Sequence, residues 1–380
     1  FDEKTQTTIS TTKEEVLALG EKFGYPIAIK ASAGGGGRGL RVVRKAEDVE
    51  QALAGAQREG ASYFGSGEVY VEKYLDRPRH IEVQILADEH GKVLHLYERD
   101  CSSQRRHQKL LEETPAAKLD ADLRKRITEA AVKGATALGY TSAGTVECMV
   151  SGNEFYFLEV NTRIQVEHPI TEATTGIDIV KEQILLACGH KLSFKQEEVS
   201  QHGHAIECRI NAEDPSKNFM PSPGTLTRFE LPHHPWVRVD TACYPGYQIL
   251  PFYDSLLAKL VVWGRTREEA IQRTRTALTH FKIEGVATTI PFHLALLDDP
   301  NCQAGEVYTT YVEQDFMKRY NAAPRAEAGK SAGSDNGAAS VPTSTKGSVR
   351  NFEVDVNQKV FKVQVTELVE PGQEKAAAGA

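Results

Sequence analysis

The sequence predicts an α+β fold, in which antiparallel hairpins alternate with amphipathic helices. Two observations support this prediction. Alternating apolar strands flank short turns at Asp88–Gly91 and at Ser151–Asn153, which is typical of β-hairpins. Residues 120–139 and 266–281 instead have apolar side chains at helical spacing. We therefore expect both kinds of element along most of the chain.

Length and composition indicate a globular chain of two or three domains. The 380 residues are 40% hydrophobic and 26% charged, which excludes a fully disordered or fibrous protein. The net charge of −7 argues against a dedicated nucleic-acid binder. We expect no membrane span and no signal peptide. The six cysteines form no C-x-x-C pair, which suggests neither a zinc site nor a disulfide framework and fits a cytoplasmic location.

The first 75 residues carry two expected helices and three expected strands. Residues 14–23 have the pattern of a helix that ends at Gly24, and residues 46–59 have helical periodicity. Strands are expected at 25–32, 40–44 and 68–75.

The next elements are two hairpins and two helices. Strands are expected at 80–87, 92–99, 145–150 and 154–160. Asp120 is a suitable N-cap for the helix over 120–139. Residues 171–189 predict one helix that Gly189 closes.

The pattern changes after about residue 200, where we expect a mixed sheet. Its strands are expected at 203–210, 225–231, 236–240 and 258–264. Thr266 is a plausible cap for the helix that follows them. Near the end of the chain, residues 351–368 alternate strictly around Asn357-Gln358 and predict another hairpin.

A glycine run, Gly34–Gly37 followed by Gly39, lies between two expected strands. It does not open a helix, as the dinucleotide fingerprint must, and it lacks the Gly-Lys-Ser/Thr of a P-loop. A glycine hairpin can lay backbone N–H groups on phosphates, although a surface turn has the same composition. Lys30, on the preceding strand, favours phosphate binding.

The segment 145–167 carries a candidate Mg²⁺ site. Glu147 lies in an apolar strand, and alternation places on one face, while the chain stays extended, Glu159, Asn161, Arg163, Gln165 and Glu167. Glu147 and Glu159 share a face only with a three-residue loop at Gly152–Glu154, since a two-residue loop pairs Glu147 with Leu158. Carboxylate and amide oxygens suit Mg²⁺ that also holds nucleotide phosphates. A solvated polar face is the alternative, which this pattern disfavours.

Three further features stay open on the residues alone. Arg105, Arg106, His107 and Lys109 fit either an anion pocket or a solvated loop. Alternation on their strands is compatible with surface positions for His80 and Arg209. The residues thus indicate a Mg²⁺–nucleotide enzyme with an anion site and do not identify its reaction.

Five long motifs then occur in a fixed order: IKASAGGGGRGLRVV, EVYVEKYLDRPRHIEVQILAD, ERDCSSQRRHQKLLEETPA, FLEVNTRIQVEHPITE and GHAIECRINAEDP. Together they resemble the biotin carboxylase component of biotin-dependent carboxylases, a family with the ATP-grasp fold, over about residues 10–318. The resemblance implies an ATP-grasp domain over 1–198, with a mobile lid at about 1–75, and a smaller mixed α/β biotin carboxylase C-terminal domain over 199–318. A flexible linker is expected at 319–349. Residues 350–380 resemble the β-rich start of a region that precedes a biotin-carrier domain.

The resemblance also implies roles for individual residues. The expected ATP contacts are Lys30, Gly36, Gly37, Glu72, Lys73, Leu75, His80, Gln104, His107, Glu147 and Glu159. The expected ligands of Mg²⁺ or Mn²⁺ are Glu147, Glu159 and Asn161. The bicarbonate pocket would comprise Lys109, Arg163, Gln165, Val166 and Glu167. Glu167 would be the general base and Arg209 would face biotin, so the implied catalytic residues are Lys109, Arg163, Glu167 and Arg209.

The implied reaction is a ligase reaction, the ATP- and bicarbonate-dependent carboxylation of biotin through carboxyphosphate. The biotin would be carried on another domain or subunit. The implied partners are a biotin carboxyl carrier domain, a second copy in a homodimer, and a carboxyltransferase subunit. The final acceptor stays open among acetyl-CoA, propionyl-CoA, a longer acyl-CoA and pyruvate.

Two alternatives accompany this interpretation. One is another ATP-grasp ligase, such as half of a carbamoyl-phosphate synthetase or a purine-pathway ligase. The other is a nucleotide-binding and subunit-contact fragment without turnover. The second follows from the expectation that the chain is truncated at both ends, because Phe1 falls inside the ATP-grasp region and no Met-Lys-Met context for a biotinyl lysine is present.

Overall fold

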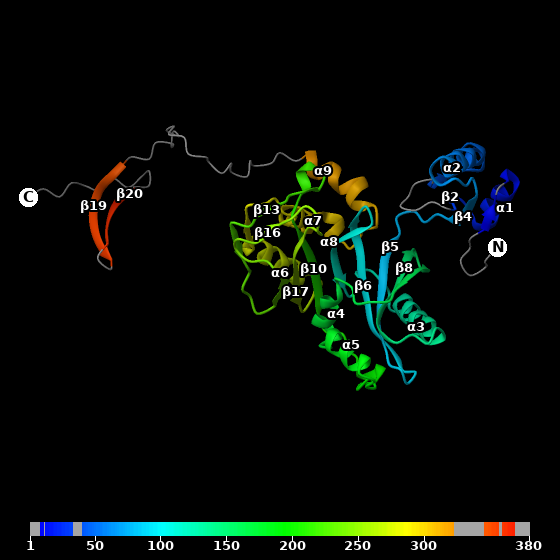
Figure 1. The fold of residues 1–380 in the computed structure, drawn as a ribbon, viewed down its shortest axis with the longest axis horizontal. Coiled ribbons are helices and arrows are strands. Elements are labelled where there is room, and N and C mark those ends of the chain that lie inside the picture. The colour runs from blue at the N-terminus through cyan, green and yellow to red at the C-terminus, as the bar shows by residue number, and fades with distance from the viewer. Residues whose placement is uncertain (1–7, 11, 33–39, 323–345, 357–358, 369–380) are drawn as a thin grey trace, which may run out of the picture. The chain divides into compact units, whose positions relative to one another are not determined.

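The structure of this protein is a computed structural model that describes residues 8–10, 12–32, 40–322, 346–356 and 359–368 (Figure 1). The chain divides into two units, Phe1–Ala323 and Pro324–Ala380. The glycine run, with Gly36 and Gly37, lies outside the described residues, as does most of the expected linker. The described part of the chain has no helix whose length and hydropathy would let it cross a lipid bilayer.

A small sheet with two helices occupies the first part of the larger unit. Its strands run in the order β1-β4-β2-β3, with bounds β1 (Thr8–Ser10), β2 (Ile27–Ala31), β3 (Leu40–Val43) and β4 (Val69–Lys73). The two helices are α1 (Lys13–Phe23) and α2 (Val49–Phe64), the latter preceded by a 3₁₀ turn at Ala46–Asp48. Thr12 and Glu15 form a capping box at the start of α1, which ends at Gly24 as predicted. The expected strands and helices of this region are confirmed.

An eight-stranded sheet forms the centre of the larger unit, with its strands in the order β15-β17-β10-β7-β6-β5-β8-β9. The first five in chain order are β5 (Arg79–Ala87), β6 (Val93–Arg105), β7 (Gln108–Thr114), β8 (Ser142–Ser151) and β9 (Glu154–Asn161). Three more come later in the chain, β10 (His204–Asn211), β15 (Val237–Thr241) and β17 (Leu256–Gly264). Both predicted hairpins are confirmed, β5 with β6 and β8 with β9.

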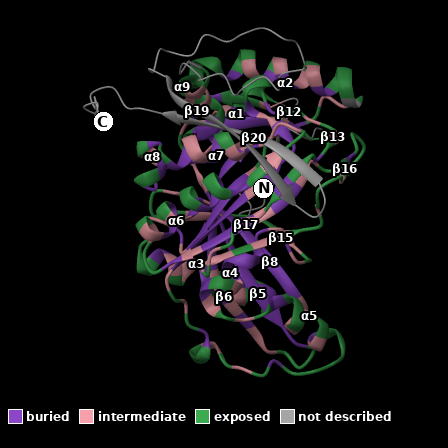
Figure 2. Cartoon of the chain, turned by 90° about the vertical axis from the view of Figure 1, so that its left-hand side faces the viewer, coloured by how far each residue is buried: buried purple, intermediate pink, exposed green. Residues whose placement is uncertain are grey.

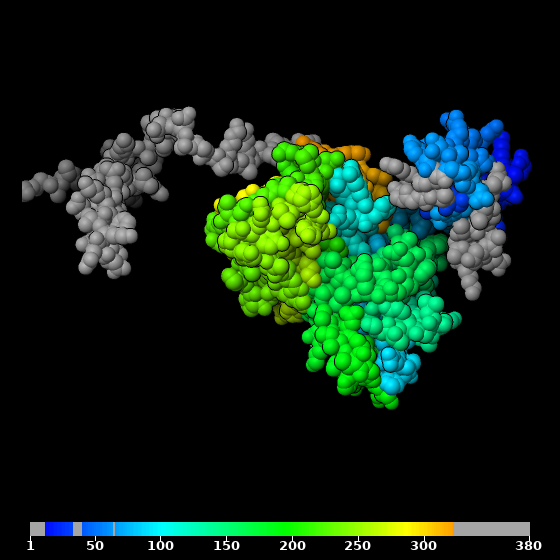
Figure 3. Space-filling view, in the orientation of Figure 1, coloured from blue at the N-terminus to red at the C-terminus, as the bar shows by residue number. Residues whose placement is uncertain are grey.

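This sheet crosses the expected domain boundary. β10 pairs with β7 on one side and with β17 on the other, so strands from both expected domains belong to one ladder. The space-filling view accordingly shows residues 79–322 as one continuous mass (Figure 3). Every strand pair in the described residues is antiparallel, so the expectation of a mixed sheet after residue 200 is wrong. The boundary at 198/199 itself stays a prediction.

Helices cover the faces of this sheet. α3 (Ala121–Ala137) packs on β5 and β6, and α6 (Arg267–His280) packs on β17 and β10. Asp120 and Thr266 cap them as predicted. Buried residues concentrate along the strands, whereas the helices keep one exposed face (Figure 2). The central strands of the sheet are therefore buried on both faces, which is unusual for strands that carry charged side chains.

The expected helix over 171–189 is two helices, α4 (His168–Thr175) and α5 (Ile179–Ala187). Gly176 ends α4 in the left-handed region, with φ of 71°. Asp178 then caps α5 by accepting a hydrogen bond from the backbone N–H of Lys181 at 2.8 Å. A glycine inside a helical pattern is compatible with continuation or with a C-cap, and here it is a C-cap.

The remaining elements are short. The later helices are α7 (Ile290–Leu297), α8 (Pro300–Gln303) and α9 (Met317–Ala322). Short strands form three two-stranded sheets, which are β11 (Glu213–Asp214) with β12 (Met220–Pro221), β13 (Gly224–Thr225) with β16 (Gln248–Ile249), and β14 (Arg228–Glu230) with β18 (Lys282–Glu284). In the second unit, β19 (Lys346–Val356) pairs with β20 (Lys359–Leu368), which confirms the hairpin predicted there.

Candidate active site

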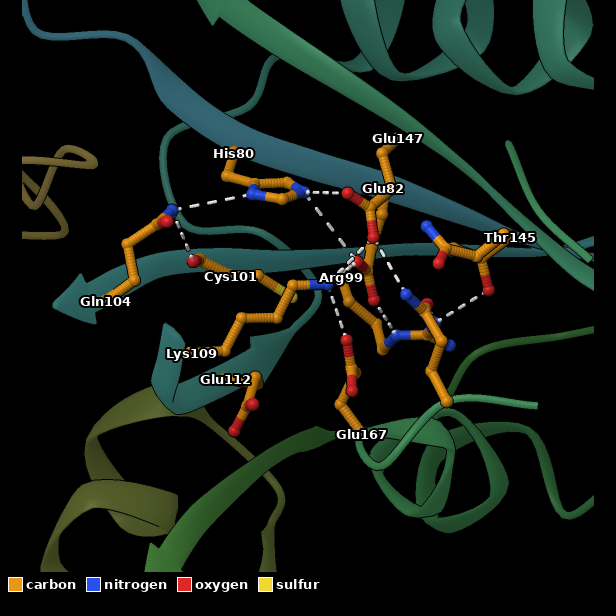
Figure 4. Close-up of polar contacts among 12 residues, drawn as sticks. His80, Glu82, Arg99, Cys101, Gln104, Lys109, Glu112, Thr145, Glu147 and Glu167 are labelled. Atoms are coloured by element: carbon orange, nitrogen blue, oxygen red, sulfur yellow. Dashed lines mark hydrogen bonds and ion pairs between the residues drawn. The ribbon is translucent and has the colours of Figure 1, made fainter. Parts of the chain in front are cut away.

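A buried polar cluster lies where β5, β6, β7 and β8 run side by side (Figure 4). Glu82 on β5 is directly opposite Arg99 on β6 and Glu147 on β8, so all three side chains share one face of the sheet. None of the three is more than 4% exposed. Because buried charges are costly unless paired, such a cluster implies a dense set of internal contacts.

Lys109, on β7, is the central cation of this cluster. Its ammonium lies 2.6 Å from Glu167 Oε1 and 3.0 Å from Glu147 Oε1, and it also contacts Glu82. Figure 4 shows it with Glu167 on one side and Glu82 and Glu147 on the other. Burial acts to lower the pKa of Lys109, but the surrounding carboxylates raise it above its usual value. The residue therefore presents a permanent positive charge.

Arg99 is fully buried and links several members of the polar cluster through hydrogen bonds. Its guanidinium donates to Glu82 at 2.6 Å and to Gln84 at 2.8 Å. Longer bonds, of 3.1 to 3.3 Å, run to Thr171, Gln165 and Thr145. One side chain thus joins four segments of the chain in a fixed fork geometry.

Glu147 and Glu159 are paired across the β8–β9 ladder, as a shared metal site requires. The loop is not the three-residue loop that we expected. Ser151 pairs with Glu154, which leaves a two-residue turn, and the register then shifts by one residue at Leu158, between the Cys148 and Glu147 pairs. A β-bulge therefore supplies the odd residue, because it sets two residues of one strand against one of the other.

The oxygen donors at this position fit Mg²⁺ or Mn²⁺. Asn161 donates from its amide to Glu159 at 3.2 Å, so its amide lies next to that carboxylate. Glu147 is buried, whereas Glu159 is exposed, so the donors extend from the cluster to the surface. A set of two carboxylates and one amide oxygen matches the hard ligands these cations prefer.

His80 is buried, so the surface position with which the alternation of its strand was compatible is wrong. Its Nε2 lies 2.9 Å from Glu147 Oε2, and Gln104 contacts its Nδ1 at 3.4 Å. Burial alone would raise the pKa of Glu147, but the contacts with His80 and Lys109 lower it to about 2. Glu147 is therefore ionised over the physiological range.

The chain leaves β9 after Asn161, so the alternation expected through Glu167 does not continue. Arg163 is exposed and donates to Asn161 at 3.3 Å. Gln165 and Glu167 instead turn into the cluster, where Gln165 donates to Glu147 at 2.8 Å. Glu167 sits at the N-cap position of α4. The backbone carbonyl of Val166 accepts from Lys259 at 3.2 Å, so this segment is fixed from β17 as well.

Arg209, on β10, also belongs to the site. Its Nη2 donates to Glu167 Oε2 at 2.9 Å and its Nε donates to Glu112 Oε1 at 2.6 Å. Alternation on β10 did not reveal this, because a central strand with both faces covered has no solvent side. Glu167 is consequently held between two cations, Lys109 and Arg209.

The polar segment 99–113 is the end of β6, a turn and the strand β7, not a loop. Arg106 and His107 form the turn with φ of 50° and 64° and are exposed. Arg105 bonds to Asn218 at 2.8 Å, whereas Lys109 points into the carboxylates. The four cations proposed as one anion pocket are therefore separated, because alternate residues of the hairpin face different surroundings.

Among the expected ATP contacts in the first 75 residues, Lys30 and Glu72 form an ion pair. They lie on the adjacent strands β2 and β4, where Lys30 also approaches the ring of Tyr70 at 5.8 Å. Lys73 is exposed and Leu75 is half-buried. Glu72, Lys73 and Leu75, at or just after the end of β4, thus offer a carboxylate, an ammonium group and an apolar side chain from one short segment.

Sequence reasoning missed several members of the cluster, namely Glu82, Gln84, Arg99, Glu112, Thr145 and Glu207. A usable signal was present. Glu82 lies between Ile81 and Val83, and Glu207 lies between Ile206 and Cys208. A charged residue inside a strongly apolar strand marks a position where burial must be compensated by a partner.

The lowered pKa of Glu147 predicts that the folded chain loses stability in acid. Its contribution is fully present above the ordinary glutamate pKa of 4.5 and is lost as the pH falls toward about 2. Since one pKa unit is worth about 1.4 kcal/mol, we expect a loss of roughly 3 kcal/mol from this residue. Urea unfolding at pH 6, 4 and 3 measures the part of this loss, about 2 kcal/mol, that is complete by pH 3. A Glu147→Gln variant should show a shallower pH dependence, and equal slopes would contradict the assignment.

Comparison with known families gives two matches that together span most of the chain. Residues 2–195 match the family model described as "Carbamoyl-phosphate synthase L chain, ATP binding domain". Residues 207–314 match the "Biotin carboxylase C-terminal domain".

Curated relatives and solved structures agree with these matches. Biotin carboxylase 1 of Bacillus subtilis is 55% identical over 302 residues, which are 79% of this chain and 67% of that protein. A pyruvate carboxylase subunit of Methanothermobacter thermautotrophicus is 52% identical over 79% of this chain and 61% of its own length. The biotin carboxylase domain dimer of Hydrogenobacter thermophilus 2-oxoglutarate carboxylase, solved with MgADP and bicarbonate, has a TM-score of 0.71 at 47% identity and covers 80% of this chain and 68% of that one. The chain thus spans about two thirds of the length of these relatives.

The fold and the buried site define an ATP-grasp ligase, in which a small sheet with two helices precedes a large antiparallel sheet. Within that class, the chain belongs to the biotin carboxylase family.

Proposed function

We propose that this chain carries out the ATP- and bicarbonate-dependent carboxylation of biotin through carboxyphosphate. The observation that carries the proposal is Glu167, which is buried and held between Lys109 at 2.6 Å and Arg209 at 2.9 Å. A carboxylate between two fixed cations is suited to take a proton from an anion that the same cations hold.

The proposed roles follow from this arrangement. Glu167 removes the proton of bicarbonate, while Lys109 and Arg163 hold the resulting dianion. Gln165 and the backbone of Val166 complete that pocket. The dianion attacks the γ-phosphate of ATP and displaces ADP, which forms carboxyphosphate. Carboxyphosphate then breaks down to CO₂ and phosphate. The phosphate takes the proton from the ureido nitrogen of biotin, and the guanidinium of Arg209 stabilises the biotin anion that then attacks CO₂.

ATP is proposed to contact Lys30, Glu72, Lys73, Leu75, His80, Gln104 and His107. The residues that would hold Mg²⁺ or Mn²⁺ are Glu147, Glu159 and Asn161. When bound, such a cation neutralises charge between the phosphate oxygens during phosphoryl transfer. The ion pair between Lys30 and Glu72 supports a role for Lys30 at the nucleotide, because its ammonium is already held on a fixed strand.

The proposed partners follow from the names of the relatives. Those relatives are subunits or domains of larger carboxylases, and one solved relative is a dimer. We propose two partners, a carboxyltransferase subunit and the domain that carries biotin, the biotin carboxyl carrier domain. We also propose a homodimer as the assembly and the cytoplasm as the location. The acceptor is left to the carboxyltransferase, since the relatives include parts of a pyruvate carboxylase and of a 2-oxoglutarate carboxylase.

A second candidate is another ATP-grasp ligase, which the name of the first family match favours. It predicts ATP turnover that does not respond to biotin. The match of residues 207–314 to a biotin carboxylase domain disfavours it.

The proposal predicts ATP hydrolysis that requires Mg²⁺ and bicarbonate and that free biotin stimulates. We would measure phosphate release with each component left out in turn. The chain would be assayed beside a version extended to the full length of the relatives, of which it spans about two thirds. Stimulation by biotin in the extended version supports the carboxylase. Hydrolysis that ignores both bicarbonate and biotin in that version would identify a different ATP-grasp ligase.

A further inference from the structure

Two glutamates behind Arg209 have no role in the reaction proposed above. Glu112 on β7 and Glu207 on β10 are directly opposite each other across the ladder. Both are completely buried. Opposed residues of antiparallel strands keep their Cβ atoms about 4.5 to 5.5 Å apart on one face of the sheet, so the two carboxyl groups are neighbours.

The two members of this pair have different partners. Glu112 Oε1 accepts a hydrogen bond of 2.6 Å from Arg209 Nε. Within the described residues, no hydrogen bond reaches the other oxygen of Glu112 or either oxygen of Glu207. Three buried carboxyl oxygens without donors would be costly if both groups were ionised.

One proton resolves this difficulty. Two adjacent buried carboxylates both ionise only where cations compensate them, as Arg99 and Lys109 do for Glu82 and Glu147. Where cations are too few, the proton goes to the carboxylate with less support for its charge.

Burial and the neighbouring Glu112 raise the pKa of Glu207 well above its usual range. Burial also raises the pKa of Glu112, but Arg209 acts against it and the value stays at about 7, so Glu112 is the first of the two to ionise. The other charges facing the pair are Arg209, Lys109, Lys259 and Glu167, and in the described part of the chain only Glu112 is hydrogen-bonded to a cation. The negative charge therefore belongs on Glu112, and a neutral Glu207 can donate its O–H to the free oxygen of Glu112.

We propose that Glu112 is a positioning residue, which holds Arg209 against Glu167 as the anionic member of a buried Glu112–Glu207 pair that shares one proton. The bond to Nε fixes the plane of the guanidinium. Its Nη2 is thereby directed at Glu167 Oε2, 2.9 Å away. This inference rests on the proposed function, because Arg209 and Glu167 are its reacting partners there.

The pair also explains why two glutamates are present where one would bind Arg209. A lone Glu112 would leave its second oxygen buried and unsatisfied, whereas a protonated neighbour supplies a donor from the adjacent strand. Replacing Glu207 with glutamine keeps a neutral donor at that position. Replacing Glu112 with glutamine removes the charge that Arg209 requires.

The experiment compares these two isosteric changes in the extended chain. We expect Glu112→Gln to lower biotin-dependent kcat by about 10- to 100-fold, as is usual when the partner of a site residue is removed, without a matching rise in the KM for ATP. The loss in Glu207→Gln should be at least about tenfold smaller. Glu112→Asp, which keeps the charge, should recover part of the loss. Glu98→Gln is the matched control, because Glu98 is equally buried and bonds to Arg124 outside the site.

A double-variant cycle tests whether Glu112 acts through Arg209. In an Arg209→Met background, adding Glu112→Gln should lower kcat by less than about twofold, because the residue that Glu112 positions is gone. Equal losses in the two glutamine variants, or additive losses in the cycle, would overturn the proposal. Urea unfolding of the same variants tests the coupling without measuring activity. In a double-variant cycle, the equilibrium constant of unfolding should show about tenfold coupling between Glu112 and Arg209, and less between Glu207 and Arg209. An extended chain without biotin-dependent turnover would refute the proposed function, and the unfolding cycle would still decide this inference.

Discussion

Replacing Glu167 with glutamine is expected to lower bicarbonate-dependent ATP turnover by about 10²- to 10⁴-fold, the range that a positioned general base contributes. Glutamine has the same shape but cannot take a proton. Lys109 and Arg209 lose the carboxylate that each contacts, at 2.6 and 2.9 Å, so the anion site gains positive charge. We therefore expect kcat to fall while the apparent affinity for bicarbonate stays the same or improves. Steady-state phosphate release at varied bicarbonate measures both.

Glu172→Gln is the matched control for this variant. Glu172 lies on the same helix, and its carboxylate accepts from the backbone of Ile179 at 2.8 Å, away from Lys109 and Arg209. Its turnover should stay within about twofold of the parent. If Glu167→Gln retained more than a tenth of the parent rate, Glu167 would not be the base and a different proton acceptor would be required.

Replacing Arg99 with methionine is expected to destabilise the fold by about 3 to 5 kcal/mol, the usual cost of breaking a buried ion pair. Glu82 would lose its 2.6 Å partner and stay fully buried. The side chains of Gln84, Gln165 and Thr145 would each lose a donor as well. The midpoint of urea unfolding measures the change. Arg99→Lys keeps the charge but not the fork geometry, so its midpoint should lie between those of the parent and of Arg99→Met.

Arg228→Met provides the comparison at the surface. Arg228 also contacts two carboxylates, Glu230 and Glu284, but its side chain is 45% exposed. Exposed pairs of this kind contribute little to the free energy of unfolding, because water and salt screen the two charges. If Arg99→Met were no less stable than Arg228→Met, Arg99 would not stabilise the buried polar cluster.

The elements that local physics determines could be predicted from the sequence. Asp120 and Thr266 cap the helices expected of them, and the turn at Asp88–Gly91 joins the expected hairpin of β5 and β6. These features depend on a few adjacent residues. The break between α4 and α5 could not be predicted in the same way, because Gly176 is compatible with both a continuous helix and a helix end.

The site was only partly predictable for a related reason. The resemblance named Lys109, Glu147, Glu167 and Arg209, which the structure brings together. Alternation alone placed His80 and Arg209 near solvent, since it assumes that one face of each strand is wet. In this sheet the second face is also covered, so polar side chains face one another. The strand β7 was missed because its polar residues point into that interior.

The shared ladder between β7 and β10 has a consequence for how the chain can be divided. The two segments that match separate families are joined by backbone hydrogen bonds within one sheet, not by an interface between two separately folded domains. A cut between them would leave two long open strand edges, each a template for pairing with other copies. The two segments are therefore interdependent parts of a single folding unit, and neither is expected to be a transferable module.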